Sequence, residues 1–308
     1  MGMSLMFNPR YELPVRLLLR CLPEIAHHRC FALKGGTAIN LFVQDLPRAS
    51  VDIDLVYLPL QPRDEALRGI HDTLISISES IMERVSGANV RESRTQNYVT
   101  KLFITAGNAM IKVESNLVFR GSIHPPIERD LCQHAQENFE LFTSAQTLAV
   151  SELYGSKLCA ALDRQHPRDL FDVKLLLESI GITPEIRRAF VVYLAAHSRP
   201  MHELLVPGLH DIGDQYERRF RGMSRFEVSL DDLREVQTSL ARLLVRSLDR
   251  DEREFLLSMK KGKPEWGLLR IEHIDRLPAL QWKLINIHKM NTEKRKVAFN
   301  RLAEVLQE

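Results

Sequence analysis

Apolar residues recur at two different spacings in the first half of the chain. A run through Leu67, Ile70 and Leu74 follows the period of an amphipathic helix, whereas Ile53 and Leu55 alternate with polar residues as in a half-buried strand. Helices and strands are therefore both expected here. The predicted helices are 12–26, 38–43 and 64–85, and the predicted strands are 30–33, 50–58, 98–105 and 110–118.

The second half of the chain shows helical spacing only. One of its helices has a clear predicted start, because Ser229 is a preferred N-cap residue and is followed by Asp231 and Asp232. We therefore predict an α+β fold, with a mixed sheet and helices in residues 1–145 and a helical bundle in 146–308. The predicted helices of the bundle are 145–164, 167–179, 184–197, 229–247, 251–260 and 277–307.

Composition narrows the class of protein without indicating its chemistry. The 308 residues are 44% hydrophobic and 27% charged, which is typical of a globular protein and excludes disordered, collagen-like and coiled-coil chains. The net charge of +2, from 42 basic and 40 acidic residues, excludes nucleic-acid binding by bulk charge alone. The chain has 19 basic and 21 acidic residues up to position 180, and 23 basic and 19 acidic residues beyond it. Contact with a nucleic acid would therefore need a local basic patch.

Cysteine usage and the lack of long apolar runs favour a cytoplasmic protein. The four cysteines have no Cys-x-x-Cys spacing, so we expect neither a disulfide framework nor a zinc site. Residues Met1–Pro9 show no export-signal pattern, and no run of 18 apolar residues predicts a membrane helix. No membrane partner is expected.

Carboxylates gather on one face of the strand that contains the first acidic motif. Because strand side chains alternate, Ser50, Asp52 and Asp54 share a face, and oxygen ligands spaced in this way suit Mg²⁺. Glu114 lies on the polar face of the strand at 110–118. If the two strands are neighbours, Glu114 supplies a third carboxylate, and three carboxylates can hold the two metal ions that assist phosphoryl transfer.

A glycine-rich turn precedes the acidic strand. In Lys34-Gly35-Gly36-Thr37 the two glycines let the backbone approach a phosphate, and N–H groups that open a helix favour an anion. Alone, Gly-Gly-Thr is usually a turn and Asp-x-Asp is usually a solvated strand end. Their order here, strand, Gly-Gly-Thr, helix and Asp-x-Asp strand, favours a nucleotide-binding site.

A basic helix face provides a second candidate site. Lys157 and Arg164 lie on one face of a predicted helix, and a proline turn brings Arg168 and Asp169 near that face. Such cations can offset the charge of a triphosphate. Alternatively, Asp169 and Asp172 only complement the helix dipole and pair with Arg168, as structural ion pairs do.

These motifs resemble those of the DNA polymerase β-like nucleotidyltransferase superfamily. Gly35-Gly36-Thr37 followed by Asp52-x-Asp54 is similar to its signature, and the wider chain resembles the AbiEii/AbiGii toxin branch, to which the MenT toxins are related. The resemblance implies a polymerase β-like domain followed by a helical domain that completes the active cleft and the acceptor site. The similar segments are 34–55, 152–172, 220–223, 255–266 and 277–284.

The resemblance also implies roles for individual residues. Asp52, Asp54 and Glu114 would bind Mg²⁺, or Mn²⁺ in its place, and Lys157 and Asp169 would complete the catalytic set. Many relatives have serine at the position of Thr37, so the hydroxyl is retained here. The implied residues that bind the NTP are Lys34, Gly35, Gly36, Thr37, Ser50, Lys157, Arg164 and Arg168.

The implied activity is metal-dependent transfer of a nucleoside monophosphate from an NTP to RNA, with the tRNA 3′ end as the expected acceptor. Blocking that end stops translation, which fits the toxin of a phage-defence toxin–antitoxin pair whose antitoxin is a separate protein, with or without stable binding. Two alternatives stay open. In the first, the acceptor is a protein or a small molecule instead of RNA. In the second, the chain is a non-catalytic NTP-binding defence module, and its sequence would lack one of the carboxylates. None is missing.

The remaining conspicuous side chains are interpreted as structural. Met110 is expected in the core, and Trp266 and Trp282 are expected to pack rather than to stack on bases. The basic runs at 260–263 and 294–296 are expected on solvated faces, with tracking of an RNA backbone as the alternative.

Overall fold

The computed structural model describes residues 7–307 and consists of two compact units. The first unit contains the chain up to Ala149 together with Arg221–Glu227, and the second contains the rest. Most of the stretch Met1–Pro9, in which we expected no export signal, lies outside the described residues. The boundary at Ala149 lies close to the one expected at 145, whereas nothing in the sequence patterns indicated that 221–227 belongs with the first unit.

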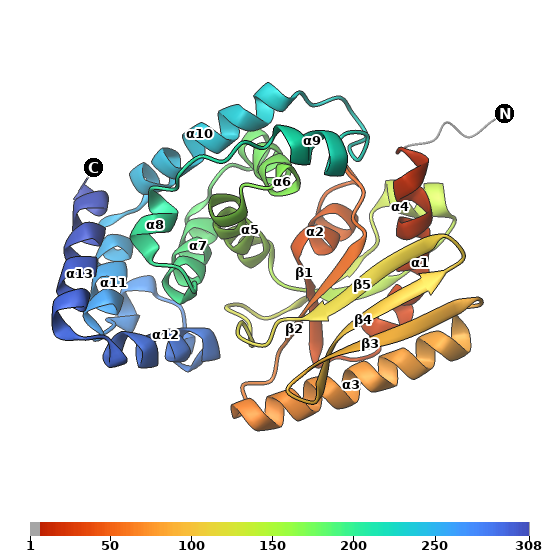
Figure 1. Ribbon diagram of the computed structural model, residues 1–308, viewed down its shortest axis with the longest axis horizontal. Helices are drawn as coiled ribbons and strands as arrows, with labels where there is room; N and C mark the ends of the chain where they lie inside the picture. The colour runs from red at the N-terminus through yellow and green to blue at the C-terminus, as the bar shows by residue number, and fades with distance from the viewer. Residues whose placement is uncertain (1–6, 308) are drawn as a thin grey trace. The chain divides into compact units, whose positions relative to one another are not determined.

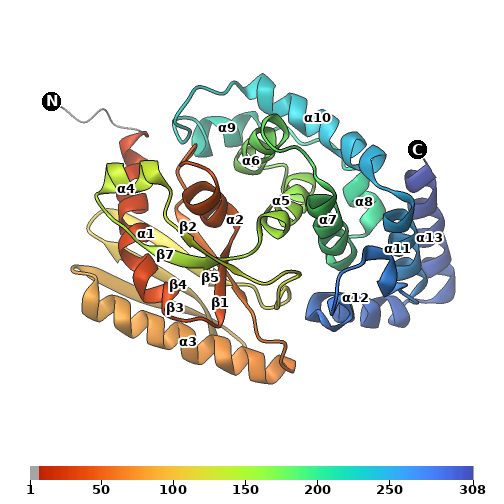
Figure 2. The same ribbon diagram turned by 180° about the vertical axis from the view of Figure 1, so that it is seen from behind.

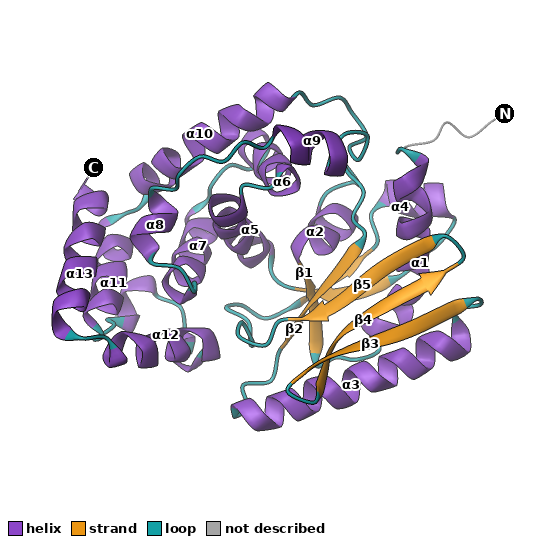
Figure 3. Cartoon of the chain, viewed as in Figure 1, coloured by secondary structure: helices purple, strands orange, loops and turns teal. Residues whose placement is uncertain are grey.

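A mixed seven-stranded sheet forms the centre of the first unit (Figure 3). Its strands are β1 (Phe31–Lys34), β2 (Asp52–Tyr57), β3 (Ala88–Thr95), β4 (Tyr98–Ala106), β5 (Ala109–Ser115), β6 (Ile127–Asp130) and β7 (Ser144–Thr147). They follow the order β3-β4-β5-β2-β1-β7-β6. The pairs β2–β5 and β1–β7 are parallel, and the other neighbours are antiparallel. The predicted mixed sheet is confirmed, and the two acidic strands are neighbours, which is the condition under which Glu114 was expected to supply a third carboxylate.

Two long helices cover one face of this sheet. Helices α1 (Pro9–Ala26) and α3 (Arg63–Arg84) lie on the same side of it (Figure 2). The apolar members of the alternating strands are buried, with Ile53 and Val113 both 0% exposed. In the described part of this unit, no helix lies over the opposite face of β3, β4 and β5 (Figure 1). The sheet therefore presents a polar face at these strands.

Several elements of the first unit were not predicted from the sequence. Strand β3 lies at the edge of the sheet and is half-buried or exposed along its whole length, so no apolar alternation marks it. The four-residue strands β6 and β7 and helix α4 (Gln133–Phe139) were also missed. The predicted helix at 145–164 is wrong in its first residues, because Ser144–Thr147 pairs with β1 and β6 as β7.

Every regular element in the described part of the second unit is helical. The α-helices are α5 (Val150–Arg164), α6 (Pro167–Glu178), α7 (Pro184–Ala196), α8 (Met201–Leu205), α9 (Gly213–Arg219), α10 (Leu230–Ser247), α11 (Arg250–Lys261), α12 (Pro278–Lys289) and α13 (Thr292–Gln307). Short 3₁₀ turns occur at Trp266–Leu269 and Ile274–Arg276. The single helix predicted over 277–307 is wrong, because Met290 ends α12 in an extended conformation. The predicted N-cap at Ser229 is confirmed by a complete capping box with Asp232.

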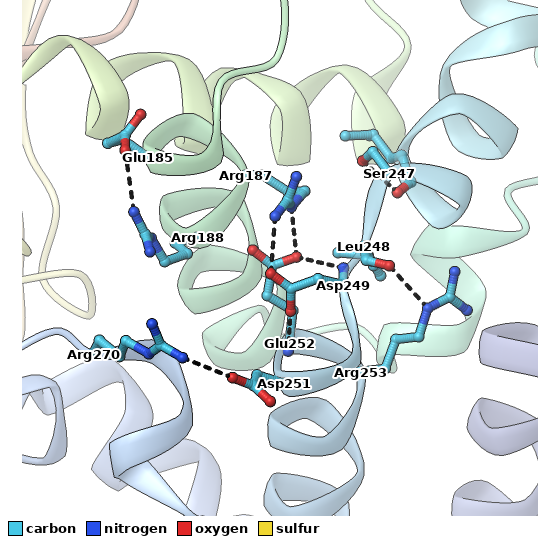
Figure 4. Close-up of polar contacts among 11 residues, drawn as sticks. Glu185, Arg187, Arg188, Ser247, Leu248, Asp249, Asp251, Glu252, Arg253 and Arg270 are labelled. Atoms are coloured by element: carbon cyan, nitrogen blue, oxygen red, sulfur yellow. Dashed lines mark hydrogen bonds and ion pairs between the residues drawn. The ribbon is translucent and has the colours of Figure 1, made fainter.

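An ion-pair network ties α7 to the start of α11 (Figure 4). Arg187 lies 2.6 Å from Glu252 and 2.9 Å from Asp249, measured between guanidinium nitrogens and carboxylate oxygens. Glu252 is only 1% exposed, and with Asp249 it forms the capping box of α11. A buried carboxylate needs such a partner because desolvation of an isolated charge is costly.

Three of the residues interpreted as structural lie elsewhere than expected. Met110, expected in the core, is 60% exposed, and Trp282, expected to pack, is 54% exposed. Lys260, expected on a solvated face, is 3% exposed. Trp266 does pack, with its ring against that of Phe255. None of the helices in the described chain is long and apolar enough to cross a membrane.

Candidate active site

The glycine-rich turn joins β1 to a short helix against the acidic strand. Helix α2 (Gly35–Ala38) begins at the glycines rather than after them, and it continues as a π-helical turn at Ile39–Val43. Gly35 has φ +68°, a conformation that favours glycine, and a Cβ there would lie 2.6 Å from Oδ2 of Asp54. A Cβ on Gly36 would lie 2.7 Å from a guanidinium nitrogen of Arg48. Glycine is thus required for the close approach of the turn to Asp54.

The buried side chain of Thr37 connects this turn to the acidic strand β2. Its hydroxyl donates to the backbone carbonyl of Asp52 and lies 2.9 Å from the hydroxyl of Ser50. Thr37 is 0% exposed and Ser50 is 5% exposed. The two hydroxyls therefore hold the turn against β2, and the expected role of Thr37 as a donor to the triphosphate stays a prediction.

Side chains on the polar face of the sheet align in two rows. In the first row, Arg91, Phe103, Lys112 and Asp52 are register partners on β3, β4, β5 and β2. In the second row, Lys101, Glu114, Asp54 and Lys34 are partners on β4, β5, β2 and β1. The predicted third carboxylate thus lies beside Asp54 on the neighbouring strand, where side chains in register approach closely.

Two lysines hold the carboxylate of Glu114. The ammonium groups of Lys101 and Lys112 lie 2.7 and 2.8 Å from its two oxygens. Burial alone would raise the pKa of Glu114, but the bonds to both lysines outweigh it and lower that pKa below its ordinary value. Burial would lower the pKa of Lys112, and Glu114 with the charges of Asp52 and Asp54 raises it instead. Both partners are therefore charged at neutral pH.

The two aspartates fit a divalent cation better than the full triad does. Asp52 and Asp54 are half-buried and offer oxygen ligands from one strand face, and Asp54 lies close to the backbone at Gly35. No group of three histidine, cysteine, aspartate or glutamate side chains arranged to hold a metal occurs within residues 7–307. Glu114 would have to exchange a lysine for the metal, so its role as a third ligand stays a prediction.

The second candidate cluster forms around Lys157 in α5. Its ammonium lies 2.9 Å from Asp169 and 2.9 Å from Asp172, both in α6, and Arg164 lies 2.8 Å from Asp169. The side chains of Lys157 and Asp169 are 6% and 5% exposed, whereas that of Arg164 is 62% exposed. The predicted approach of α6 to the basic face of α5 is confirmed. The role of these residues in binding phosphate stays a prediction, because the same contacts serve a structural ion-pair cluster.

A histidine begins the helix that supplies the two aspartates of this cluster. The Nδ1 atom of His166 accepts a hydrogen bond from the backbone N–H of Arg168 at 3.1 Å, which makes His166 the N-cap of α6. Its buried Nε2 has no hydrogen-bond partner within the described chain. Burial, helped by the charge of Arg168, lowers the pKa of His166 to about 4. The ring is therefore neutral at physiological pH.

The two predicted groups belong to different units. The glycine turn, Ser50 and the three carboxylates belong to the first, and Lys157, Arg164, Arg168 and Asp169 belong to the second. Sequence patterns did not single out three cations of the first unit, Arg48, Lys101 and Lys112. Lys112 and Lys101 had a detectable signal, since strand alternation places both on the polar face. Arg48 had none, because it lies in a loop and approaches Gly36 only through the fold.

The match to a protein-family model identifies the chain as a nucleotidyltransferase, in agreement with its glycine turn and aspartate pair. The chain belongs to the family described as nucleotidyl transferase AbiEii toxin of type IV toxin–antitoxin systems, whose model matches residues 16–286. None of the curated proteins matches it.

The solved structures that align with this chain include a bacterial toxin and a trypanosomal enzyme. The nucleotidyltransferase toxin MenT4 from Mycobacterium tuberculosis aligns over 97% of this chain and 95% of its own, at 17% identity and a TM-score of 0.58, which indicates a shared fold. Terminal uridylyl transferase 4 from Trypanosoma brucei with bound dUTP aligns over 98% of this chain and 94% of its own. Its identity of 12% and TM-score of 0.31 are too low to support an argument.

Proposed function

We propose that this toxin transfers a nucleoside monophosphate from an NTP to the 3′ end of an RNA, with tRNA as the acceptor, and that it requires Mg²⁺ or Mn²⁺. The observation that carries the proposal is the contact of the glycine turn with Asp54, where a Cβ on Gly35 would meet a carboxylate oxygen at 2.6 Å. Such a turn lets backbone N–H groups approach a phosphate immediately beside two carboxylates. The family and its toxin–antitoxin context support the transfer reaction itself.

The residues of the first unit divide the work of this reaction. Backbone N–H groups at the start of α2 bind phosphate oxygens, while Thr37 and Ser50 fix the turn against β2. Asp52 and Asp54 would hold the divalent cation, which when bound supplies Lewis-acid stabilisation of charge on phosphate oxygens. Lys101 and Lys112 hold Glu114 as an anion beside Asp54, which keeps a third negative charge next to the proposed cation site.

The class of acceptor can be tested by finding whether RNA or protein receives the labelled nucleotide. The purified toxin is incubated with Mg²⁺, each of the four labelled NTPs and a mixture of total RNA and total protein. We expect label on small RNA and loss of that label after treatment with ribonuclease. Label on protein alone would contradict RNA as the acceptor and would favour the alternative of protein nucleotidylation.

The proposed catalytic pair can be tested in the same assay. Asp52→Asn and Asp54→Asn should each lower transfer by at least about a hundredfold, because each removes a charged ligand from the phosphoryl-transfer site. The matched control is Asp72→Asn, which changes an exposed aspartate on α3 and should leave transfer unchanged. In cells, growth inhibition should follow the same order. Full toxicity of both site variants would support the non-catalytic alternative.

A further inference from the structure

The polar face of β3, β4 and β5 carries a half-buried aromatic ring surrounded by cations. Phe103 lies on β4, the guanidinium carbon of Arg91 lies 4.6 Å from the centre of its ring, and Lys112 is its register partner on β5. Met110, on the same face of β5, is 60% exposed. We name Arg91, Phe103, Lys101, Met110 and Lys112 the sheet platform. Core packing does not explain why Phe103 and Met110 lie on this face, since the apolar core lies on the other face of the sheet.

The sheet platform is continuous with the aspartate pair. Arg91, Phe103, Lys112 and Asp52 form one row across four neighbouring strands, which are spaced by about 5 Å each. The glycine turn contacts β2 from the other direction, through β1 and α2. An in-line transfer places the attacking and leaving oxygens on opposite sides of the phosphorus. A triphosphate on the glycine turn therefore leaves the platform side of β2 for the acceptor.

The chemistry of the platform matches unpaired RNA. Lys101 and Lys112 are paired with Glu114, and Asp52 and Asp54 lie at the β2 end of the same rows, so the cation that this face offers to a phosphate is Arg91 on the edge strand. Unstacked bases stack on aromatic rings and on guanidinium planes, and the Phe103–Arg91 pair presents both on a sheet face that no helix of this unit covers. Bases within a duplex are already paired and stacked on one another, so unpaired bases are the ones available to this surface.

We propose that the sheet platform binds the single-stranded 3′ end of the RNA acceptor, with one base stacked against the Phe103–Arg91 pair and a neighbouring phosphate bound by the same guanidinium. This inference rests on the proposed function and adds to it the surface that positions the acceptor. The ring and the guanidinium together hold the strand so that its terminal hydroxyl reaches the aspartate pair. The platform thereby favours acceptors with unpaired 3′ ends over blunt duplexes.

The test is equilibrium binding of a 5′-labelled single-stranded RNA of about ten nucleotides, which needs no transfer reaction. Phe103→Leu should weaken binding by about tenfold, since base–aromatic stacking contributes roughly 1–3 kcal/mol per base. Phe103→Tyr keeps the ring and should keep the affinity, which separates loss of stacking from misfolding. Arg91→Gln should weaken binding and lower the slope of log affinity against log salt by about 0.7, the value for one phosphate of a single strand.

Arg68→Gln provides the matched control, because Arg68 is exposed on α3 and lies away from the platform. It should bind RNA as the wild type does. NTP binding, measured without RNA, should be unchanged in all the platform variants. Equal RNA affinity of wild type and Phe103→Leu would overturn the platform, and so would a loss of NTP affinity in Phe103→Leu that matches its loss of RNA affinity.

The outcomes also separate this inference from the proposed function. If the wild type transfers nucleotides to RNA and the platform variants do so equally well, only the platform is wrong. If the wild type neither binds RNA nor transfers to it, both are wrong. Binding of blunt duplex RNA as tightly as the single strand would contradict the platform alone.

Discussion

Gly35 is the residue at which backbone conformation and chemistry constrain the chain most tightly. Its positive φ turns β1 into α2, and its missing Cβ leaves room for the carboxylate of Asp54. Replacement by any other residue strains the backbone and displaces a proposed metal ligand at once. At this scale the sequence was informative, because the motif order predicted that the glycines and aspartates would meet.

Gly35→Ala should abolish measurable transfer while leaving the protein folded. We expect a loss of at least about a hundredfold in kcat/KM, because a displacement of about 1 Å at the reacting groups has effects of this size. The control is Gly87→Ala, since Gly87 has φ +75° but a Cβ there would contact nothing within 4 Å. Both variants carry the same kind of backbone strain, so equal loss of transfer in the two would contradict the proposed role of Gly35.

Variants of Thr37 test whether its hydroxyl positions the glycine turn or contacts the nucleotide. Thr37→Ser keeps the bond to the carbonyl of Asp52 and should retain transfer within a few fold. Thr37→Val leaves that carbonyl without its donor, which costs about 1–3 kcal/mol of stability. Thermal unfolding with and without NTP distinguishes the roles. A positioning group lowers stability in both conditions, whereas loss of NTP stabilisation with unchanged basal stability would indicate direct contact.

His166 should make the stability of the protein depend on pH below neutrality. Its pKa of about 4 in the folded state lies below the ordinary value of 6.5, so the unfolded chain takes up the proton first. The stability present above pH 6.5 is therefore lost progressively as the pH falls toward 4. Because solvent partly screens the ring, the loss should be about 1–2 kcal/mol.

His166→Asn keeps a side-chain acceptor for the N–H of Arg168 and removes the titrating group. Urea unfolding at pH 7.5 and pH 5 should show a smaller drop in the free energy of unfolding for this variant than for the wild type. The exposed His27, for which Asn is substituted in a parallel variant, serves as the control. An identical pH dependence in wild type and His166→Asn would contradict the role assigned to the ring.

At the scale of elements, a strand or helix could be predicted from the sequence when one of its faces is apolar and the other polar. β2, β4 and β5 alternate between a buried apolar face and a polar one, so their positions could be predicted, whereas the pairing of β2 with β5 was only a condition that the structure meets. β3 and β6 are edge strands with little burial and carry no such pattern. β7 was interpreted as the start of a helix because only its pairing with β1 and β6 distinguishes it.

The junction of α7 and α11 should depend on one buried ion pair. Arg187→Met leaves Glu252 buried without its cation and should lower the free energy of unfolding by about 3 kcal/mol. The control is Arg188→Met, which breaks the more exposed pair with Glu185 on the same helix and should cost under about 1 kcal/mol. Chemical denaturation measures both. Equal effects of the two variants would show that burial of Glu252 does not matter to stability.

At the scale of the whole molecule, the sequence motifs predict the type of reaction more readily than they predict how the chain divides into two units. Local patterns predicted the mixed sheet and the helical second part. They also marked the glycine and aspartate motifs as a candidate site. The return of Arg221–Glu227 to the first unit could not, because it rests on backbone bonds such as those from Ala49 to Met223 and from Arg225 to Pro47. Such long-range contacts leave no periodic signal in the chain.

The central claim is that Asp52 and Asp54 support nucleotide transfer to an RNA 3′ hydroxyl. The most direct test is incubation of the toxin with Mg²⁺, each of the four NTPs and deacylated tRNA, followed by sequencing of the tRNA 3′ end. The account predicts added nucleotides on intact tRNA, and none on tRNA whose terminal diol has been oxidised by periodate or in reactions with Asp54→Asn. Addition to oxidised tRNA, undiminished addition by Asp54→Asn, or no addition to intact tRNA with any NTP would contradict it.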